Sequence, residues 1–248
     1  MERTATPPQP WPPSSLLAHL SADARDALLT LGTVRRYRVR QVLMREGERT
    51  THAILLRAGF VKVTAVADGG RNALIAIRMA GDLIGELGAI DGAPRAATVV
   101  ASAGVCGNDI SRGELLSFLR EHPDASFAIT GMVGARLRQA NKRRLDVMGF
   151  AVRARIARVL IELGERFGYD TTRAQGFELA ITQQDLAEFA GTTQVSVQRA
   201  LRALRAKGLL TTGYGRIAVK RVEALRDEGH VQNSPIASSD LFFRPAAT

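Results

Sequence analysis

The sequence predicts an α+β fold, in which a barrel of short antiparallel strands is followed by one long helix and a helix-turn-helix with a β-hairpin. Three observations support this prediction. Short β-rich runs alternate with glycine turns over residues 34–105, and this spacing favours an antiparallel barrel or sandwich. Residues 123–148 contain no helix breaker except two glycines. Helical periodicity resumes after residue 151 and ends in two short strand-like runs on either side of residue 214.

The two ends of the chain have the composition of disordered tails. Proline at the density of PPQPWPPSS prevents both helix formation and strand pairing, and the C-terminal end is polar and contains two prolines. The segment Gly149 to Ala151 is the natural boundary after the long helix. The predicted organisation is a tail at 1–15, a barrel domain at 16–122, a long helix with its hinge at 123–150, a helix-turn-helix domain at 151–229 and a tail at 230–248.

Local signals fill in the barrel domain. Apolar residues at helical spacing predict a helix over 16–31, with Ser21 and Asp23 as local caps. Ser111 is expected to cap a second helix that His122 ends together with the proline after it. Glycines that need a positive φ should mark the corners between strands, at Gly47, Gly59, Gly69, Gly70 and Gly81.

The long helix carries a repeat typical of a coiled-coil seam. Val133, Leu137, Asn141 with its neighbour Ala140, Arg144 and Met148 follow one another in steps of three or four. A helix of about 25 residues is about 37 Å long, enough to bridge two domains. We therefore expect the chain to form a homodimer through this helix.

The charge of the chain points to an anionic partner. The net charge is +10, and Lys and Arg gather after residue 135. Nucleic acid is the first class of partner to consider and a membrane surface the second. No apolar run reaches the roughly 20 residues of a membrane span, and the N-terminus has no signal-peptide pattern. These features predict a cytoplasmic protein without a membrane partner.

The sequence lacks the residues that a disulfide, an iron–sulfur cluster, a metal site or a catalytic centre would need. Cys106 is the single cysteine, so neither an internal disulfide nor an iron–sulfur cluster can form, and we expect it buried on a strand. The four histidines lack the i, i+4 spacing of metal ligands, so no metal site is predicted. No nucleophile–base set is evident, which disfavours the rival class, an enzyme or a regulatory subunit controlling one.

The C-terminal part has the spacing of a helix-turn-helix. The two helices of this motif need a small residue where they approach and a glycine in the turn, and Ala187 and Gly191 supply them. Val197 then fills the core from the second helix, and Thr182 is placed to cap the first. Residues 209–212 and 216–219 are expected to form a hairpin wing. An ordinary helical hairpin would require neither this spacing nor a wing.

The second helix of this motif enters the major groove of DNA. Arg199 can pair with guanine and a glutamine with adenine, whereas other polar residues are better placed for phosphates, which position the protein without reading sequence. The predicted base-contacting residues are Gln194, Ser196, Gln198 and Arg199. The predicted phosphate-contacting residues are Thr182, Gln183, Thr193 and Arg202.

A second constellation lies at 81–101, where an apolar strand runs into Gly85-Glu86-Leu87 and then reaches Arg95. Glycines let the backbone approach a ligand, and successive N–H groups can cradle a phosphate. An arginine offers a forked charge partner for that phosphate. A buried glutamate can accept hydrogen bonds from ribose hydroxyls. Glycine, acid and arginine at this spacing within a barrel of short strands indicate a nucleotide site.

Both constellations, in this order and joined by a long helix, resemble the cyclic-AMP receptor protein/Fnr family of transcription regulators, in its Crp-like branch. The resemblance covers about residues 16–225. It implies an N-terminal cyclic-nucleotide-binding-like β-roll of the jelly-roll type, a dimerisation helix and a C-terminal winged helix-turn-helix. It also implies a homodimer that binds double-stranded DNA and is not an enzyme, with RNA polymerase as a further partner to consider.

The resemblance also implies a ligand site in the roll, with no cofactor required. An effector such as cyclic AMP would be bound there, although Ala96 replaces a hydroxyl residue that bonds the phosphate, and Ala140 replaces a hydroxyl residue that reads the base. Arg136 aligns with an arginine that reaches the site and could pair with Glu86. The implied ligand residues are Gly85, Glu86, Leu87, Arg95, Ala96, Arg136, Ala140 and Asn141.

Two departures leave the effector and the DNA target open. Because Ala96 and Ala140 remove polar partners, a regulator that needs no effector, or uses a different one, is the alternative; its roll would mainly support dimerisation. Gln194 and Val195 stand where the cyclic-AMP receptor has Arg and Glu, and only Arg199 is kept. A different half-site is therefore expected.

Overall fold

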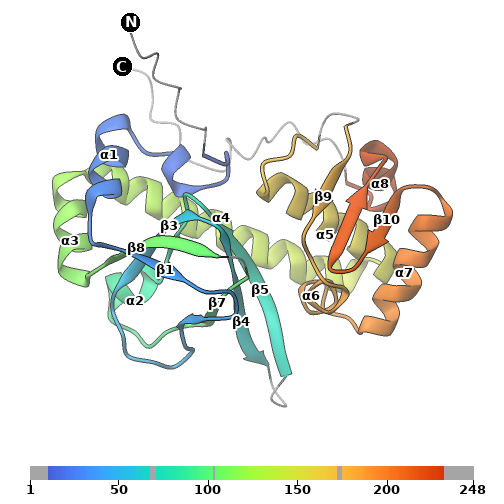
Figure 1. Cartoon of the computed structure of the whole chain (residues 1–248), viewed down its shortest axis with the longest axis horizontal. Coiled ribbons are helices and arrows are strands. Elements are labelled where there is room, and N and C mark those ends of the chain that lie inside the picture. The colour runs from blue at the N-terminus through green and yellow to red at the C-terminus, as the bar shows by residue number, and fades with distance from the viewer. Residues whose placement is uncertain (1–10, 68–70, 103, 172–174, 232–248) are drawn as a thin grey trace, which may run out of the picture.

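The computed structural model describes residues 11–67, 71–102, 104–171 and 175–231. A β-roll with three surrounding helices forms one half, and a mainly helical domain with a small sheet forms the other (Figure 1). The long helix α4 (Pro123–Gly149) runs from the first half to the second. This arrangement confirms the predicted fold class.

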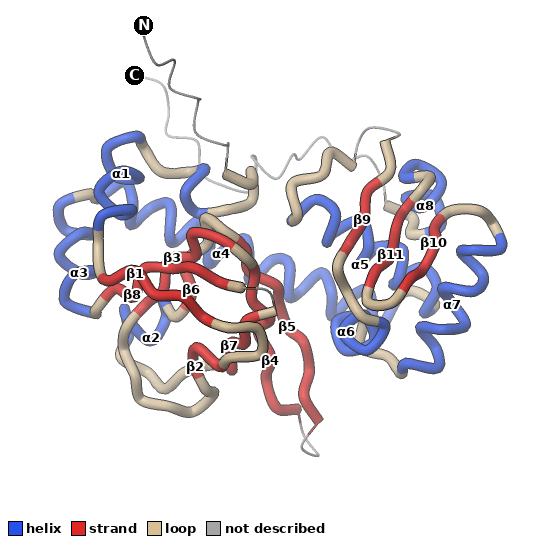
Figure 2. Tube along the Cα trace, in the orientation of Figure 1, coloured by secondary structure: helices blue, strands red, loops and turns tan. Residues whose placement is uncertain are grey.

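The roll consists of two four-stranded antiparallel sheets, in the orders β1-β8-β3-β6 and β2-β7-β4-β5 (Figure 2). Gly47, Gly59 and Gly81 have the expected positive φ, of 81°, 79° and 89°, whereas Gly69 and Gly70 lie outside the described residues. Cys106 is on a strand but is half-buried rather than buried. The strands are β1 (Thr33–Tyr37), β2 (Val42–Met44), β3 (Ala53–Ala58), β4 (Phe60–Ala67), β5 (Arg71–Met79), β6 (Leu83–Ile84), β7 (Thr98–Ala101) and β8 (Val105–Ile110).

The predicted disordered tail at 1–15 extends too far along the chain, because residues 11–15 are part of the folded roll. Trp11 packs against the core of the roll, and Ser15 is only 2% exposed. The helix predicted over 16–31 is divided into a short 3-10 helix, η1 (Leu16–Ala18), and α1 (Ala22–Thr30). The division falls at Ser21, whose side chain caps α1 by accepting from the N–H of Ala24, because the cap requires an extended backbone at that residue.

Two shorter helices lead into α4. Helix α2 (Glu86–Asp91) follows β6, and α3 (Arg112–Glu121) begins with a capping box between Ser111 and Glu114, as the sequence predicted for Ser111. On α4, Ile129 and Met132 pack against the core of the roll, and Val133 is partly buried there. Val133 therefore does not belong to an exposed seam. The apolar side chains that α4 leaves exposed are Phe127, Leu137, Leu145, Val147 and Met148.

The C-terminal domain places three helices and three strands of the described chain around helix α5 (Val152–Arg166). The predicted wing is present as β10 (Leu210–Gly213) and β11 (Arg216–Val219), and α8 (Val222–Glu228) follows it. The sequence reading missed a third strand, β9 (Phe177–Leu179), which pairs with β11. The helix-turn-helix consists of α6 (Gln183–Phe189) and α7 (Gln194–Ala206).

A bulge in β5 allows this strand of the roll to pack into the core of the C-terminal domain as well. Thr64 pairs with Leu74 and Val63 with Ala76, which leaves Ile75 as the extra residue. Because side chains alternate along a strand, the extra residue puts Leu74 and Ile77 on the same face. Both pack into the core of the C-terminal domain.

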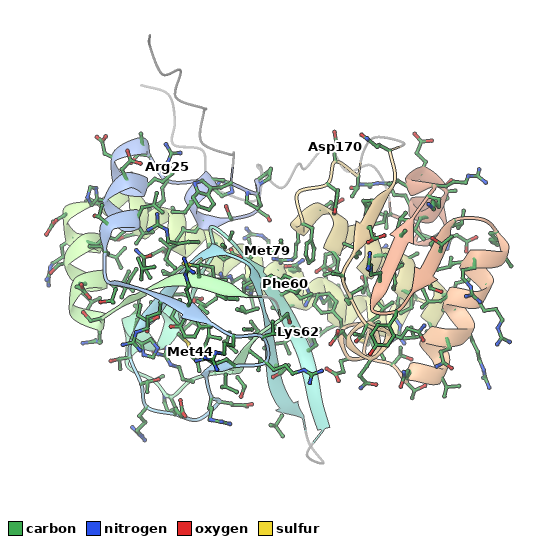
Figure 3. The ribbon with its side chains drawn as sticks, viewed as in Figure 1. Arg25, Met44, Phe60, Lys62, Met79 and Asp170 are labelled. Carbon is green, nitrogen blue, oxygen red and sulfur yellow. The ribbon has the colours of Figure 1, made fainter. Side chains whose placement is uncertain are left out.

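Polar and aromatic contacts reinforce this junction. The ring of Phe60 meets that of Phe167 edge to face, with centroids 5.5 Å apart. Lys62 Nζ lies 2.6 Å from Asp185 Oδ1 on α6. Phe60, Lys62 and Met79 lie along the side of the roll nearest the C-terminal domain (Figure 3). The roll therefore holds the helix-turn-helix domain through both apolar and ionic contacts.

Truncating Ile77 should loosen a helix more than a hundred residues away. Ile77 is 1% exposed, so Ile77→Ala should cost about 2–5 kcal/mol of unfolding free energy and raise amide hydrogen exchange in α6. Leu55→Ala, in a core made only of N-terminal residues and α4, is the matched control and should leave α6 better protected. Equal exchange of α6 in the two variants would show that β5 does not hold the C-terminal domain.

Candidate functional site

A cavity of about 220 Å³ lies where the sequence predicted a nucleotide site. Gly85 ends β6 with a φ of 74°, and α2 begins at the next residue, Glu86. A Cβ on Gly85 would lie 2.6 Å from Nη1 of Arg95, so only glycine leaves room for the arginine. Gly85, Glu86, Leu87, Arg95, Ala96 and Arg136 all line this cavity, as expected for a common site.

Arg95 is a buried cation held entirely by neutral acceptors. It is 5% exposed. Its Nε donates to Thr50 Oγ1 at 2.9 Å, Nη1 to the carbonyl of Gly85 at 2.9 Å and Nη2 to the carbonyl of His52 at 2.6 Å. Within the described part of the chain it forms no ion pair. Burial lowers the pKa of Arg95, and burial together with the Arg95 charge lowers the pKa of His52.

Glu86 and Arg136 connect the cavity to α4. The expected pair is present: Nη1 of Arg136 donates to Oε1 of Glu86. Nη2 of Arg136 donates to the carbonyl of Leu83 at 2.9 Å and lies 3.8 Å from Asp82 Oδ1. Because Arg136 is on α4 and Glu86 begins α2, any ligand that competes for this pair acts directly on the long helix.

Two residues implied by the resemblance do not reach the cavity. Ala140 and Asn141 are exposed on α4, one turn beyond Arg136, and neither lines the cavity of its own chain. They lie on the helix that bears the exposed apolar residues, so a second chain packed on α4 would cover them. Their role in ligand binding remains a proposal.

A second ionic cluster joins α4 to the C-terminal domain. The guanidinium of Arg143 pairs with Glu162 on α5, and its Nη1 donates to the carbonyl of Ile75, a residue of the cavity wall, at 2.5 Å. Glu162 also accepts from Gln139 at 2.6 Å. The Arg143 guanidinium lies 3.9 Å from the ring centroid of Phe189 on α6. Arg143 thus contacts the roll, α5 and α6 at once.

The helix-turn-helix packs as its spacing predicted. Ala187 is 2% exposed where the helices approach, and Val197 is fully buried. Gly191 has a φ of 59° in the turn, which favours glycine. Thr182 caps α6 by accepting from the N–H of Asp185 at 3.1 Å. Thr193 caps α7 by accepting from the N–H of Ser196.

Most of the predicted DNA-contacting residues are available. Thr182, Thr193, Gln194, Gln198, Arg199 and Arg202 are exposed. Gln183 and Ser196 are partly buried, and the Ser196 hydroxyl lies 3.0 Å from the Thr193 hydroxyl. Val195 is 57% exposed beside them. The face of α7 opposite the core therefore presents amides, guanidinium groups and one apolar side chain, a combination suited to base edges and phosphates.

The sequence reading missed two charged residues in the roll. Arg78 lines the cavity and Lys62 pairs with Asp185. Both stand in apolar strand runs, FVKVTAV and NALIAIRM, and a charge inside such a run is the signal that could have identified them. In the described part of the chain no group of three or more His, Cys, Asp or Glu residues could hold a metal ion. None of the described helices could span a membrane.

Comparison with known proteins identifies the family. The sequence model of the cyclic nucleotide-binding domain matches residues 34–122, and that of the Crp-like helix-turn-helix domain matches residues 154–228. The chain belongs to the Crp/Fnr family of DNA-binding transcription regulators, which act by binding DNA rather than as enzymes.

Individual relatives cover most of the chain at low identity. The CRP-like cAMP-activated global transcriptional regulator of Mycobacterium tuberculosis is 28% identical over 163 residues, 66% of this chain and 73% of the relative. The cyclic AMP receptor protein of Thermus thermophilus is 26% identical over 86% of this chain and 96% of its own length. The anaerobic regulatory protein of Bacillus subtilis is 24% identical over 88% of this chain and 92% of its length.

Solved structures show the same fold. The CLP regulator of Xanthomonas campestris, described as c-di-GMP responsive, matches with a TM-score of 0.68 at 22% identity, over 80% of this chain and 99% of its own. FixK2 of Bradyrhizobium japonicum matches with a TM-score of 0.69 at 20% identity, over 79% of this chain and 96% of its own.

Proposed function

We propose that this regulator acts as a homodimer and that a nucleotide bound in the roll controls its affinity for DNA. The observation that carries the proposal is Arg95, a buried guanidinium that lines a cavity and has no ion-pair partner among the described residues. Taking a charge out of water costs several kcal/mol unless an opposite charge offsets the loss. A bound phosphate would supply that charge.

The expected ligand is a nucleotide such as cyclic AMP. Relatives from two organisms are named for activation or reception of cyclic AMP, and a structural relative is described as c-di-GMP responsive. Glu86 is 5% exposed at the cavity wall, where its carboxylate can accept from a ribose hydroxyl. Ala96 lines the same wall and offers no hydroxyl to a phosphate. The names of the relatives therefore support a nucleotide as the class of ligand, but they do not single out cyclic AMP.

The proposed control runs along α4. A ligand at Arg95 and Glu86 alters the Glu86–Arg136 pair, which connects the cavity to α4. Farther along that helix, the Arg143–Glu162 pair transmits a movement of α4 to α5. Ligand binding thus shifts the population between two arrangements of the helix-turn-helix domains. The hinge after α4 favours such movement, because Ala151 stands at the N-cap of α5 without a side-chain cap.

The proposed dimer uses the exposed apolar side of α4. Leu137, Leu145 and Met148 are 62%, 67% and 84% exposed. Soluble proteins rarely leave several large apolar side chains unburied along one helix unless another surface covers them. A two-fold dimer packs the same face of both copies together and brings two recognition helices to one DNA site.

The alternative is a regulator that needs no effector, whose roll mainly supports dimerisation. The absence of a hydroxyl at Ala96 and the modest cavity volume favour it. Arg95 argues against it, because a purely structural roll would not need a buried cation beside an open cavity.

Substitutions at Arg95 and Ala96 test nucleotide binding. Arg95→Ala should abolish binding of cyclic AMP, and Arg95→Lys should keep the charge but lose the fork. Ala96→Ser should strengthen binding by about 1 kcal/mol or more by restoring a donor. Isothermal titration calorimetry measures all three. If neither the wild type nor Ala96→Ser binds at millimolar cyclic AMP, cyclic AMP is not the effector of this protein.

Arg199 and Arg202 should differ in how they affect DNA binding. With a site selected from random DNA, Arg199→Ala should cost about 1–3 kcal/mol and relax specificity at one base pair. Arg202→Ala should weaken all sequences alike and lower the salt slope by about 1. Fluorescence anisotropy on the selected and on random DNA measures both. Equal losses of Arg199→Ala on the two DNAs would reject its assignment as a base reader.

A charge on the exposed side of α4 should dissociate the dimer. Leu137→Asp places a carboxylate in the proposed interface, where no partner compensates its burial. Sedimentation velocity at micromolar concentration should show a dimer for the wild type and a monomer for this variant. Val34→Asp, at a residue 55% exposed on β1, is the control and should stay dimeric. A wild type that is monomeric yet binds DNA tightly would contradict the proposal.

A further inference from the structure

The cavity holds a second arginine that the proposed function does not use. Arg78 is on β5, where its neighbour across the strand pair is the fully buried Val61. This register turns Arg78 to the inner face of the roll, opposite to the face of Ile77. Arg78 lines the same cavity as Glu86, Arg95 and Arg136. Three of the four charged residues that line this cavity are therefore arginines.

Arg78 has its charge offset by carboxylates that lie beyond ion-pair distance, those of Asp82 and Glu86. Its one hydrogen bond goes from Nη1 to the carbonyl of the preceding residue, Ile77, at 3.3 Å, and it forms no ion pair with any residue that the structure describes. Burial, and then the positive charge of Arg136, lower the pKa of Arg78 well below its ordinary value. A guanidinium stays protonated in proteins nevertheless, so the charge remains in the cavity wall.

The carboxylates nearby are already engaged. Glu86 pairs with Arg136, and Asp82, which does not line the cavity, lies 3.8 Å from Arg136 and accepts from the N–H of Met79. Arg136 thus forms ion pairs, whereas Arg78 and Arg95 form none with any described residue. Carboxylates act on these two cations from beyond ion-pair distance: Asp82 and Glu86 on Arg78, and Glu48 and Glu86 on Arg95. A single negative charge, such as the phosphodiester of cyclic AMP, offsets only one of these two cations.

We propose that the effector of this protein carries at least two negative charges, one bound by Arg95 and another by Arg78. This inference rests on the proposed function, since it concerns the ligand of the same cavity. Two kinds of nucleotide have this chemistry. One is a nucleotide with a terminal phosphate or diphosphate group, and the other is a cyclic dinucleotide, which contains two phosphodiesters. Arg78 is then the residue that distinguishes both from a cyclic mononucleotide.

The test is calorimetric titration of the full-length protein with cyclic AMP, ADP and cyclic di-GMP. At least one of the two polyanions should bind ten times more tightly than cyclic AMP. Arg78→Gln should weaken that polyanion about ten- to a hundredfold, as expected for loss of a bond between charged groups, and change cyclic AMP binding less than about threefold. Arg78→Lys should retain part of the preference, because it keeps the charge.

Controls separate a local from a general charge effect. Arg36→Gln removes the same charge from an exposed residue of β1 that does not line the cavity, and it should bind all three ligands like the wild type. Thermal unfolding checks that each variant folds, and the preferred polyanion should raise the melting temperature of the wild type. Preference for ADP identifies a terminal phosphate, and preference for cyclic di-GMP identifies a dinucleotide.

Different results would overturn the two proposals. Wild-type protein that binds cyclic AMP as tightly as both polyanions, or Arg78→Gln that weakens all three ligands equally, rejects the role of Arg78 but leaves the nucleotide site intact. Ligands that bind equally well to Arg95→Ala reject the site itself, and the proposed function with it. If none of the three ligands binds, the inference about charge is wrong, and DNA binding by the unliganded protein then supports the effector-independent alternative.

Discussion

Strand β5 is the constraint on which both halves of this molecule depend. One of its faces closes the cavity of the roll, through Arg78 and the bulged Ile75, and the other enters the core of the C-terminal domain, through Leu74 and Ile77. The cavity of the roll and the core of the C-terminal domain are therefore separated only by the thickness of this strand. Interiors packed at this density transmit small displacements rather than absorb them. The contacts of β5 thus offer a path from the cavity wall to the helix-turn-helix domain that bypasses the hinge after α4.

The long helix offers a second route, and its contacts are ionic rather than apolar. Arg136 and Arg143 lie two turns apart on α4, and each pairs with a carboxylate of a different half of the molecule, Glu86 in the roll and Glu162 in α5. Glu162 also lies 3.7 Å from Nε of Arg166. A partly buried carboxylate that serves several cations is costly to remove, because each cation would lose its partner. The relative position of α4 and α5 is thereby restricted to arrangements that keep Glu162 paired.

Sequence periodicity was sufficient for most of the fold, because the elements concerned are amphipathic or bounded by strong local signals. The caps at Ser111 and Thr182 and the turn at Gly191 depend only on neighbouring residues, so the sequence located them correctly. Strand β9 was missed because three residues are too short for a pattern, and its pairing with β11 is long-range. Residues 11–15 were judged by their prolines, but the contact of Trp11 with the roll, which no local rule contains, orders them.

In the candidate site too, local motifs could be predicted from the sequence, whereas long-range contacts could not. Gly85, Glu86 and Arg95 lie in one short motif, and their common cavity was predicted. Arg78 lies outside that motif and reaches the cavity only because of the sheet register, which depends on the bulge at Ile75. The seam on α4 stays a prediction. Val133, one of its expected residues, packs partly against the roll, because helical spacing alone cannot say which neighbouring face meets the roll.

The bulge in β5 also separates two properties that can change independently during evolution. Substitutions at Ala76 or Arg78 alter the cavity face without touching Leu74 or Ile77, so the ligand can change while the domains remain docked. A deletion of Ile75 would remove the bulge but leave Leu74 and Ile77 two positions apart and still on one face. The cavity would lose a lining residue, and Arg143 would lose the carbonyl that it binds. Even the loss of that codon would alter the cavity while keeping the docking face of the strand, and point substitutions let related regulators acquire new effectors on an unchanged framework.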